Sequence, residues 1–432
     1  MIESHSLNRA QKEAVGLLSI GTFLEYFDLM LYVHMAVLLN ELFFPKTDPF
    51  TDSLLSAFAF CSIFVFRPFG ALIFGYIGDN IGRKATIVIT TFFMSISCLI
   101  MANLPTYAEI GITATWLITM CRLFQGMSSM GEIVGAEIYL TEVIKPPLQY
   151  PTVMLIAVAS ILGGTAALGL ASIVTSYGFN WRMAFWAGSC IALIGAVART
   201  TLRETIDFAD AKRRIKLSLE KNQLKSTVLE DDYHYKEKAN KMTLLSLLLI
   251  QCGWPICFYF TYIYCGNFLK LGFGFTADQV IHQNFNVSMI ALLGYIAITF
   301  LCYKIHPLKI LQFKVWIFCP FALITPYLLN HINDPLQLFF IQSFFVLFVL
   351  STNPATPVFY THIPVFKRFT CGSLIYAISR AAMHVITAFG LVYLTEYFGH
   401  WGIIILIIPM SIGFAFGVYH FKKLEIEAGN YY

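Results

Sequence analysis

Three polar residues interrupt an apolar run near the start of the chain, "FLEYFDLMLY". Glu25, Asp28 and Tyr32 are three and four residues apart, so at about 100° per helical residue they fall within one stripe of about 60°. A buried carboxyl group that gains and loses a proton is the usual element of a proton relay. Either acid could instead form a fixed ion pair with Arg67 or Arg122, and the sequence leaves both possibilities open.

A second polar stripe lies in "CRLFQGMSSMGEIVGAEIYLTE". Arg122, Gln125, Ser129 and Glu132 occupy about 80° of one helix face, with Arg122 about 15 Å from Glu132 along the axis. We expect Arg122 and Gln125 to bind substrate together with Tyr32, and Glu132 to take part in proton coupling with the two acids of the first stripe. The alternative for Arg122 is an anchor at the membrane edge that reaches out to water.

A third stripe lies late in the chain, in "YAISRAAMHVITAFG". It contains Tyr376, Arg380, His384 and Thr387. Arginine binds carboxylates through a planar fork, so the first three residues are predicted to bind substrate. Four aromatic residues of the seventh run form a further candidate group: Trp254, Tyr259, Tyr262 and Tyr264. They could enclose a quaternary amine by cation–π contact, although lipid contact or helix packing would explain most of them equally well.

These stripes need helices in a membrane to position them. The chain has 432 residues, of which 57% are hydrophobic and 12% charged, whereas soluble domains carry about 25% charged residues. Apolar runs of roughly 20 residues repeat, which is the length of a helix that crosses a bilayer. We read twelve, near 14–40, 52–76, 85–103, 113–139, 150–176, 183–201, 243–269, 281–303, 309–330, 336–360, 371–395 and 400–420. The chain is predicted to be an all-α, multi-pass membrane protein whose first run is a retained helix.

The basic residues predict the orientation. With the N-terminus inside, 22 of the 29 Lys and Arg residues fall in inside segments, as the positive-inside rule requires. Lys314 is counted among them. We expect a plasma membrane protein, of the bacterial inner membrane, with both termini in the cytoplasm. The net charge of +4 is explained by topology and predicts no nucleic acid partner.

The longest polar stretch, 202–242, divides the chain. Six runs precede it in 1–201 and six follow it in 243–432. We expect two six-helix halves joined by a cytoplasmic linker that forms a surface helix. The Cys and His residues form no metal-ligand pattern, and no nucleotide loop or nucleophile motif occurs. The sequence therefore predicts no enzyme, no cofactor and no metal site.

The turn "GYIGDNIGRK" connects the second and third runs. Its glycines allow a sharp reversal, and Arg83 and Lys84 place it inside. Asp79 has two explanations: it caps the third helix, or it binds the positive end of a neighbouring helix in one conformation and releases it in another.

This turn resembles the cytoplasmic signature of the major facilitator superfamily. Further stretches resemble the metabolite:proton symporter branch of that family, which includes proline/betaine and citrate carriers. They are "FLEYFD", "RPFGALIFG", "CRLFQGMSSMGEIVGAEIYLTE", "WRMAFW" and "LRET". The C-terminal half departs from the pattern, because "CYKIHPLKI" lacks the acid and glycines and "THIPVFKR" keeps only the proline and basic residues.

The resemblance implies two halves that rock around a site at the membrane midplane. The glycine turn would latch the halves on the cytoplasmic side, with a gating set of Asp79, Arg83, Lys84, Arg67 and Glu142. The expected function is secondary active import of a zwitterionic osmolyte such as proline or betaine, or of an organic acid, with protons. The expected protein is a monomer whose partners are this solute, protons and membrane lipid. A transporter-derived sensor without flux, or a uniporter or exchanger of organic anions or sugars, is the alternative.

Overall fold

The computed structural model describes residues 6–45, 58, 61–129, 133–177, 180–200 and 239–431. All regular structure in these residues is helical, which confirms the predicted all-α class. Several predicted features lie outside the described residues. They are residues 202–238 of the linker, Glu132, and the side chains of Asp79 and Arg83.

The first half contains the following helices of very different lengths, and residues 61–65 just before α3 are helical as well. The helices are α1 (Arg9–Phe43), α3 (Arg67–Asn80), α4 (Arg83–Asn103), α5 (Tyr107–Ile110), α6 (Ile112–Ser128), α7 (Ile133–Val143), α8 (Gln149–Tyr177) and α9 (Arg182–Arg199).

The second half begins after the linker. Its elements are α12 (Lys241–Gln251), α13 (Gly253–Phe258), the π-helical η3 (Tyr259–Tyr264), α14 (Cys265–Phe273), α15 (Ala277–Lys304), α16 (Pro307–Asn330), α17 (Pro335–Leu347), η4 (Asn353–Ala355), α18 (Thr356–Thr361), α19 (Val365–Phe398), η5 (Gly399–Trp401) and α20 (Gly402–Glu427).

The described helices make twelve passes, in the order of the twelve predicted runs. Eight stretches of the described residues are long and apolar enough to cross a membrane, and one of them, 367–427, contains both α19 and α20. The other passes are shorter or broken, such as α6 followed by α7.

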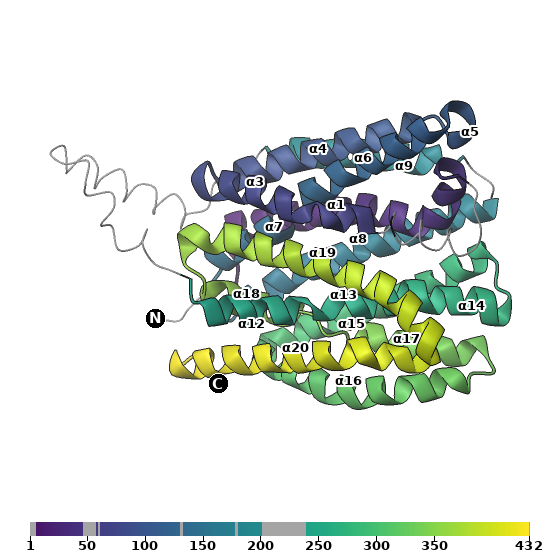
Figure 1. Cartoon of the computed structure of the whole chain (residues 1–432). Helices are drawn as coiled ribbons and strands as arrows, with labels where there is room; N and C mark the ends of the chain where they lie inside the picture. The colour runs from purple at the N-terminus through teal and green to yellow at the C-terminus, as the bar shows by residue number, and fades with distance from the viewer. Residues whose placement is uncertain are drawn as a thin grey trace.

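The helices lie side by side in one bundle (Figure 1). The two halves meet where α8 packs on α15 and where α3 packs on α19. We call the end where α1 begins and α20 ends the base of the bundle. The turn from α3 to α4 and the turn from α18 to α19 both lie at the base.

The tenth pass is not the continuous helix that the run 336–360 predicts. α17 ends at Leu347, residues 349–352 are not helical, and η4 and α18 follow. Pro354 and Pro357 explain the break, because proline has no backbone N–H and disfavours helix in the residue before it.

A glycine allows the close helix crossing within the first half. A Cβ atom at Gly126 of α6 would collide with the backbone carbonyl of Ile63. Small residues at such crossings let two helix backbones approach closely.

Candidate functional site

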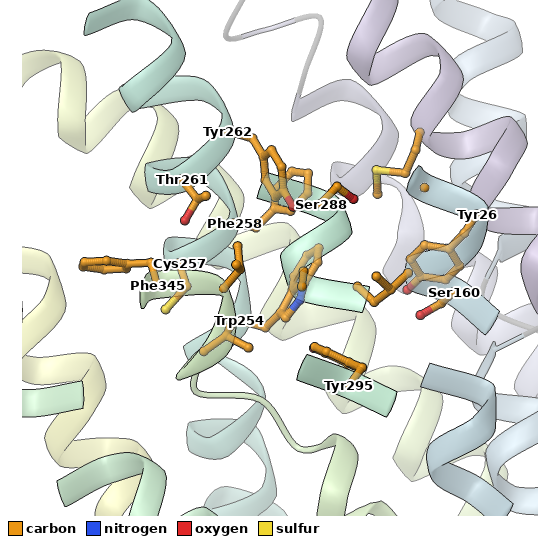
Figure 2. Close-up of a pocket in the computed structure, with 16 residues that line it drawn as sticks. Tyr26, Ser160, Trp254, Cys257, Phe258, Thr261, Tyr262, Ser288, Tyr295 and Phe345 are labelled. Carbon is orange, nitrogen blue, oxygen red and sulfur yellow. The ribbon is translucent and has the colours of Figure 1, made fainter. Parts of the chain in front are cut away.

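A cavity of about 570 Å³ lies between the two halves. Figure 2 shows Tyr26 and Ser160 of the first half on one side, with Trp254, Phe258 and Tyr262 of the second half opposite. The remaining lining residues are Met30, Ile161, Gly164, Cys257, Thr261, Ser288, Ala291, Tyr295, Phe345, Val346 and Val349. The 570 Å³ includes open solvent; the enclosed space is about 60 Å³, which is below the range of about 300–1,000 Å³ that is usual for small-molecule sites.

The cavity wall combines aromatic rings with hydroxyl groups. Trp254 and Phe258 stack with their ring centres 4.7 Å apart, and the ring of Tyr262 lies 5.1 Å from that of Phe258. Thr165, one residue beyond Gly164, shares a hydrogen bond of 2.6 Å with the lining Ser288 across the two halves. Among the described lining residues none carries a charge, so recognition of a charged solute needs a group behind this first layer.

Arg380 is such a group. Its guanidinium carbon lies 4.6 Å from the ring centre of the lining Trp254 and 4.6 Å from that of Tyr376. Nη1 donates a 2.9 Å hydrogen bond to the Gln251 carbonyl, where α12 ends. Arg380 is 5% exposed, and among the described residues it makes no ion pair and its Nε has no hydrogen-bond partner. The Nε edge of the guanidinium therefore keeps an unused N–H donor behind the cavity wall.

The third predicted stripe extends from this wall into the protein. The Tyr376 hydroxyl lies 3.2 Å from that of Tyr26, which lines the cavity. The His384 ring is fully buried, 3.8 Å from the Phe64 ring and 6.1 Å from Trp254. The structure thus brings Tyr376, Arg380 and His384 together, but none of the three lines the cavity itself.

Arg67, predicted as a gating residue, lies close to this group. It is buried, with its guanidinium carbon 4.5 Å from the Phe64 ring centre. Its electrostatic neighbours include Tyr376 and Glu25. The structure therefore places Arg67 beside the predicted substrate residues of α19 and not at the turn between α3 and α4.

Four residues of the first two stripes gather with Cys98 in a second group, the N-half polar cluster, whose Arg122 has Arg67 as an electrostatic neighbour. We define it as Asp28, Tyr32, Cys98, Arg122 and Gln125. The guanidinium carbon of Arg122 lies 3.7 Å from the Tyr32 ring centre, and the Gln125 amide donates to the Cys98 sulfur at 3.3 Å. Arg122 is 1% exposed, which rules out the alternative of an anchor at the membrane edge.

Asp28 is enclosed within the cluster. Its carboxylate faces the Cys98 thiol, and a Cβ atom at Gly188 of α9 would collide with its Oδ1. Among the described residues Asp28 forms no ion pair with Arg67 or Arg122, and no guanidinium nitrogen of Arg122 has a hydrogen-bond partner. Glu25 is also buried, and it lies on the side of Arg67.

Contacts between the halves close the base. Arg368 Nη1 lies 3.3 Å from Glu142 Oε1, and the Tyr360 hydroxyl donates to Glu137 Oε2 at 3.2 Å. Phe369 packs against Gly78 and Gly135 of the first half. Glu142 thus lies in a contact of the kind predicted for the gate, whereas its partner Arg368 was not predicted. Lys84 lies half-buried at the same end.

Histidines occupy both places where the second half departs from the family pattern. His306 follows α15 and His362 follows α18, and both approach the buried Glu425 near the end of α20. Their Nε2 atoms lie 3.8 Å and 2.6 Å from its carboxylate oxygens. Glu425 thus places an acid of α20 beside both departing segments, and it links the end of α20 to the segments that follow α15 and α18.

The predicted aromatic group is only partly at the cavity. Trp254 and Tyr262 line it. Tyr264 is directed elsewhere, because its hydroxyl forms a 2.7 Å hydrogen bond with His400. The prediction missed Tyr26, Ser160, Ser288 and Tyr295, whose only signal is a polar atom on an otherwise apolar helix.

Comparison with protein families gives one match over most of the chain. Residues 18–330 match the model described as Major Facilitator Superfamily. The inner membrane metabolite transport protein YhjE of Escherichia coli (strain K12) is 31% identical over 305 residues, 67% of this chain and 65% of that protein. The proline/betaine transporter of Salmonella typhimurium is 28% identical over 277 residues, 62% of this chain and 55% of that protein. The matches thus span roughly half to two thirds of these curated relatives.

Solved structures share the fold at low sequence identity. The proton:xylose symporter XylE bound to 6-bromo-6-deoxy-D-glucose has a TM-score of 0.71 at 15% identity, covering 93% of this chain and 94% of that one. The transporter FucP in the outward conformation has a TM-score of 0.68 at 13% identity, covering 96% and 99%.

Proposed function

The chain belongs to the major facilitator superfamily, a family of transporters and not of enzymes, and from this premise we propose that it is a secondary active transporter. The proposed reaction is import of a small organic solute together with protons. The solute is a zwitterion such as proline or betaine, or an organic acid. Curated relatives support both classes, since one is the proline/betaine transporter and another, 33% identical over 202 residues, is a citrate-proton symporter of Salmonella typhi.

The observation that carries the proposal is the position of Arg380 beside the cavity. The cavity lies at the seam between the halves, where alternating access exposes a site first to one side and then to the other. A buried cation with no acidic partner among the described residues favours an incoming carboxylate. Trp254 and Tyr262 offer ring faces that suit the cationic end of a zwitterion.

The N-half polar cluster supports proton coupling. Asp28 is a buried carboxyl group with no ion pair among the described residues, so burial favours its neutral form unless the protein compensates the charge. We assign the proton to Asp28, with Glu25 as the second acid of the same helix. Glu132 remains a proposed member of the pathway and lies outside the described residues.

The contacts at the base support an outward-facing state. The chain is a multi-pass membrane protein, and we propose that it lies in the bacterial inner membrane with its base in the cytoplasm, as its basic residues indicate. The Glu142–Arg368 ion pair and the Tyr360–Glu137 hydrogen bond would then hold the cytoplasmic side closed.

Uptake into proteoliposomes tests the proposal. Purified protein is screened against proline, betaine, citrate and other dicarboxylates, and sugars, with an imposed inward proton gradient. Accumulation of a zwitterion or organic acid that an uncoupler abolishes is the expected result. Uptake that follows a sodium gradient and ignores pH would contradict proton coupling. Binding without flux, or flux only as exchange, would favour the sensor or exchanger.

A further inference from the structure

The break in the tenth pass exposes backbone inside the bundle. α17 ends at Leu347, and Val349, Leu350, Ser351 and Thr352 are buried although they are not helical. The last carbonyl groups of a helix lack partners within it and carry partial negative charge. Within a membrane backbone groups require partners from the protein, so the carbonyl groups of this non-helical segment also need donors from neighbouring helices.

The side chain of Lys314 is one such donor. Its Nζ donates a 3.1 Å hydrogen bond to the Val349 carbonyl. Lys314 is 4% exposed, although it was counted among the lysines of the inside segments. The correction follows from its depth, since it lies seven residues beyond Pro307, about 10 Å along α16.

In the described part of the chain, thiols and not carboxylates surround Lys314. The titratable groups that face it are the thiols of Cys257 on α13 and Cys302 on α15. Among the described residues no carboxylate forms an ion pair with it. A buried ammonium group without a carboxylate is costly, so the bond to the Val349 carbonyl, two residues beyond the end of α17, is what stabilises its charge.

This cation lies directly behind the cavity wall. Val349, whose carbonyl accepts the bond, lines the cavity, as does Cys257. Tyr295 lines it too, and its hydroxyl accepts a 3.1 Å hydrogen bond from Asn353 on the other side of the break. If residues 348–353 became disordered, the two parts of the cavity wall formed by Val349 and Tyr295 would therefore move.

We propose that Lys314 is a proton-binding group whose ammonium holds the cavity wall in place at this break. The protonated side chain bonds to the Val349 carbonyl just beyond α17, and loss of the proton removes the charge attraction and frees residues 348–353. Lysine suits this role, because a buried lysine can release its proton whereas an arginine cannot. This inference goes beyond the proposed transport activity, and its test requires no substrate.

Hydrogen exchange of the backbone amides in 348–355, corrected for intrinsic rates, tests it at pH 6.5 and 9.5. The full-length protein is compared with Lys314→Arg and Lys314→Met, and with Lys304→Met as a control at an exposed lysine near the end of α15. In the unaltered protein we expect the protection factors of these amides to be about tenfold or more lower at pH 9.5 than at pH 6.5. A tenfold change corresponds to the loss of one charge-assisted hydrogen bond. Lys314→Arg should be protected at both pH values, Lys314→Met at neither, and Lys304→Met should behave as the unaltered protein.

Two results would overturn the inference. Full protection of 348–355 in Lys314→Met would show that the ammonium does not hold the break. Equal protection of the unaltered protein at both pH values would show a fixed cation that does not exchange its proton. The second comparison needs only the unaltered protein and Lys314→Arg, so it stands even if Lys314→Met does not fold.

Discussion

The N-half polar cluster and the cavity wall of the second half bury charge in different surroundings. In the first, Asp28 and Arg122 are packed among Tyr32, Cys98 and Gln125, and neither lines the cavity. In the second, Arg380 and Lys314 each lie behind one layer of cavity-lining groups. Asp28 in the first half is thus buried in the same cluster as a cation, Arg122, and away from the cavity, whereas the buried cations Arg380 and Lys314 of the second half lie beside the cavity.

This difference suggests a division of labour between the halves. A carboxyl group sealed in a packed helix cluster can exchange a proton without contacting a solute. A guanidinium beside a cavity of about 570 Å³ can reach a solute after a small movement of the covering rings. If the division is correct, single substitutions should affect either proton coupling or solute affinity, and few should affect both.

The largest effect is expected from Asp28→Asn. An amide cannot exchange the proton, so accumulation driven by a proton gradient should fall to the level of protein-free vesicles. Solute affinity should stay within about threefold, because Asp28 does not line the cavity. Uptake and exchange in proteoliposomes measure this, with Glu109→Gln at an exposed acid as control. Normal accumulation would move the proton role to Glu25, tested by Glu25→Gln.

Arg380→Lys should have the next largest effect, on affinity. Loss of one charge-assisted bond to a carboxylate costs about 1.5–3 kcal/mol, or roughly 10- to 100-fold in the dissociation constant. Arg182→Lys is a matched control, since Arg182 also lies 4.6 Å from a tryptophan ring centre and donates to a backbone carbonyl, at 2.8 Å, but lies away from the cavity. Unchanged affinity in Arg380→Lys would reject Arg380 as the carboxylate anchor.

Trp254→Leu should have a smaller effect that depends on the solute. Loss of one cation–π contact costs about 0.5–2 kcal/mol, a factor of roughly 2 to 30. Betaine should show this loss and a dicarboxylate should not, which distinguishes the two proposed classes. Trp316, which is 80% exposed, provides the control Trp316→Leu. A similar loss for both solutes would mean that Trp254 acts only by shaping the wall.

The smallest effect on affinity is expected at the base. Asp79→Asn should slow transport while affinity changes by no more than a few fold, because the turn is far from the cavity. Glu142→Gln should act in the same direction by removing the ion pair with Arg368. Transport rates and binding measured on the same preparations check both variants. Lost binding with a normal rate of conformational exchange would contradict the gate assignment.

The regular features of the fold were accessible from the sequence. Apolar runs set the twelve passes, and a 3.6-residue period placed Tyr376, Arg380 and His384 on one buried face of α19. The break in the tenth pass had a local signal that was not used, the two prolines of "NPATP".

The other contacts join residues that are far apart in the sequence, and no local sequence pattern predicts them. Glu142 and Arg368 are 226 residues apart, and their pairing follows only from how the halves pack at the base. Lys314 was misplaced for the same reason. In the sequence, a lysine near the start of an apolar run is typical of the positive-inside rule. Only the packing of the broken tenth pass against α16 shows that Lys314 is buried.

Calorimetric titration of the best solute, repeated in buffers of different ionisation enthalpy, tests the division between the halves most directly, because it gives affinity and the number of linked protons together. For Asp28→Asn the account predicts near-normal affinity with no linked proton. For Arg380→Lys it predicts weakened affinity with the linked proton retained. Asp28→Asn that loses affinity, together with Arg380→Lys that keeps it, would contradict the account.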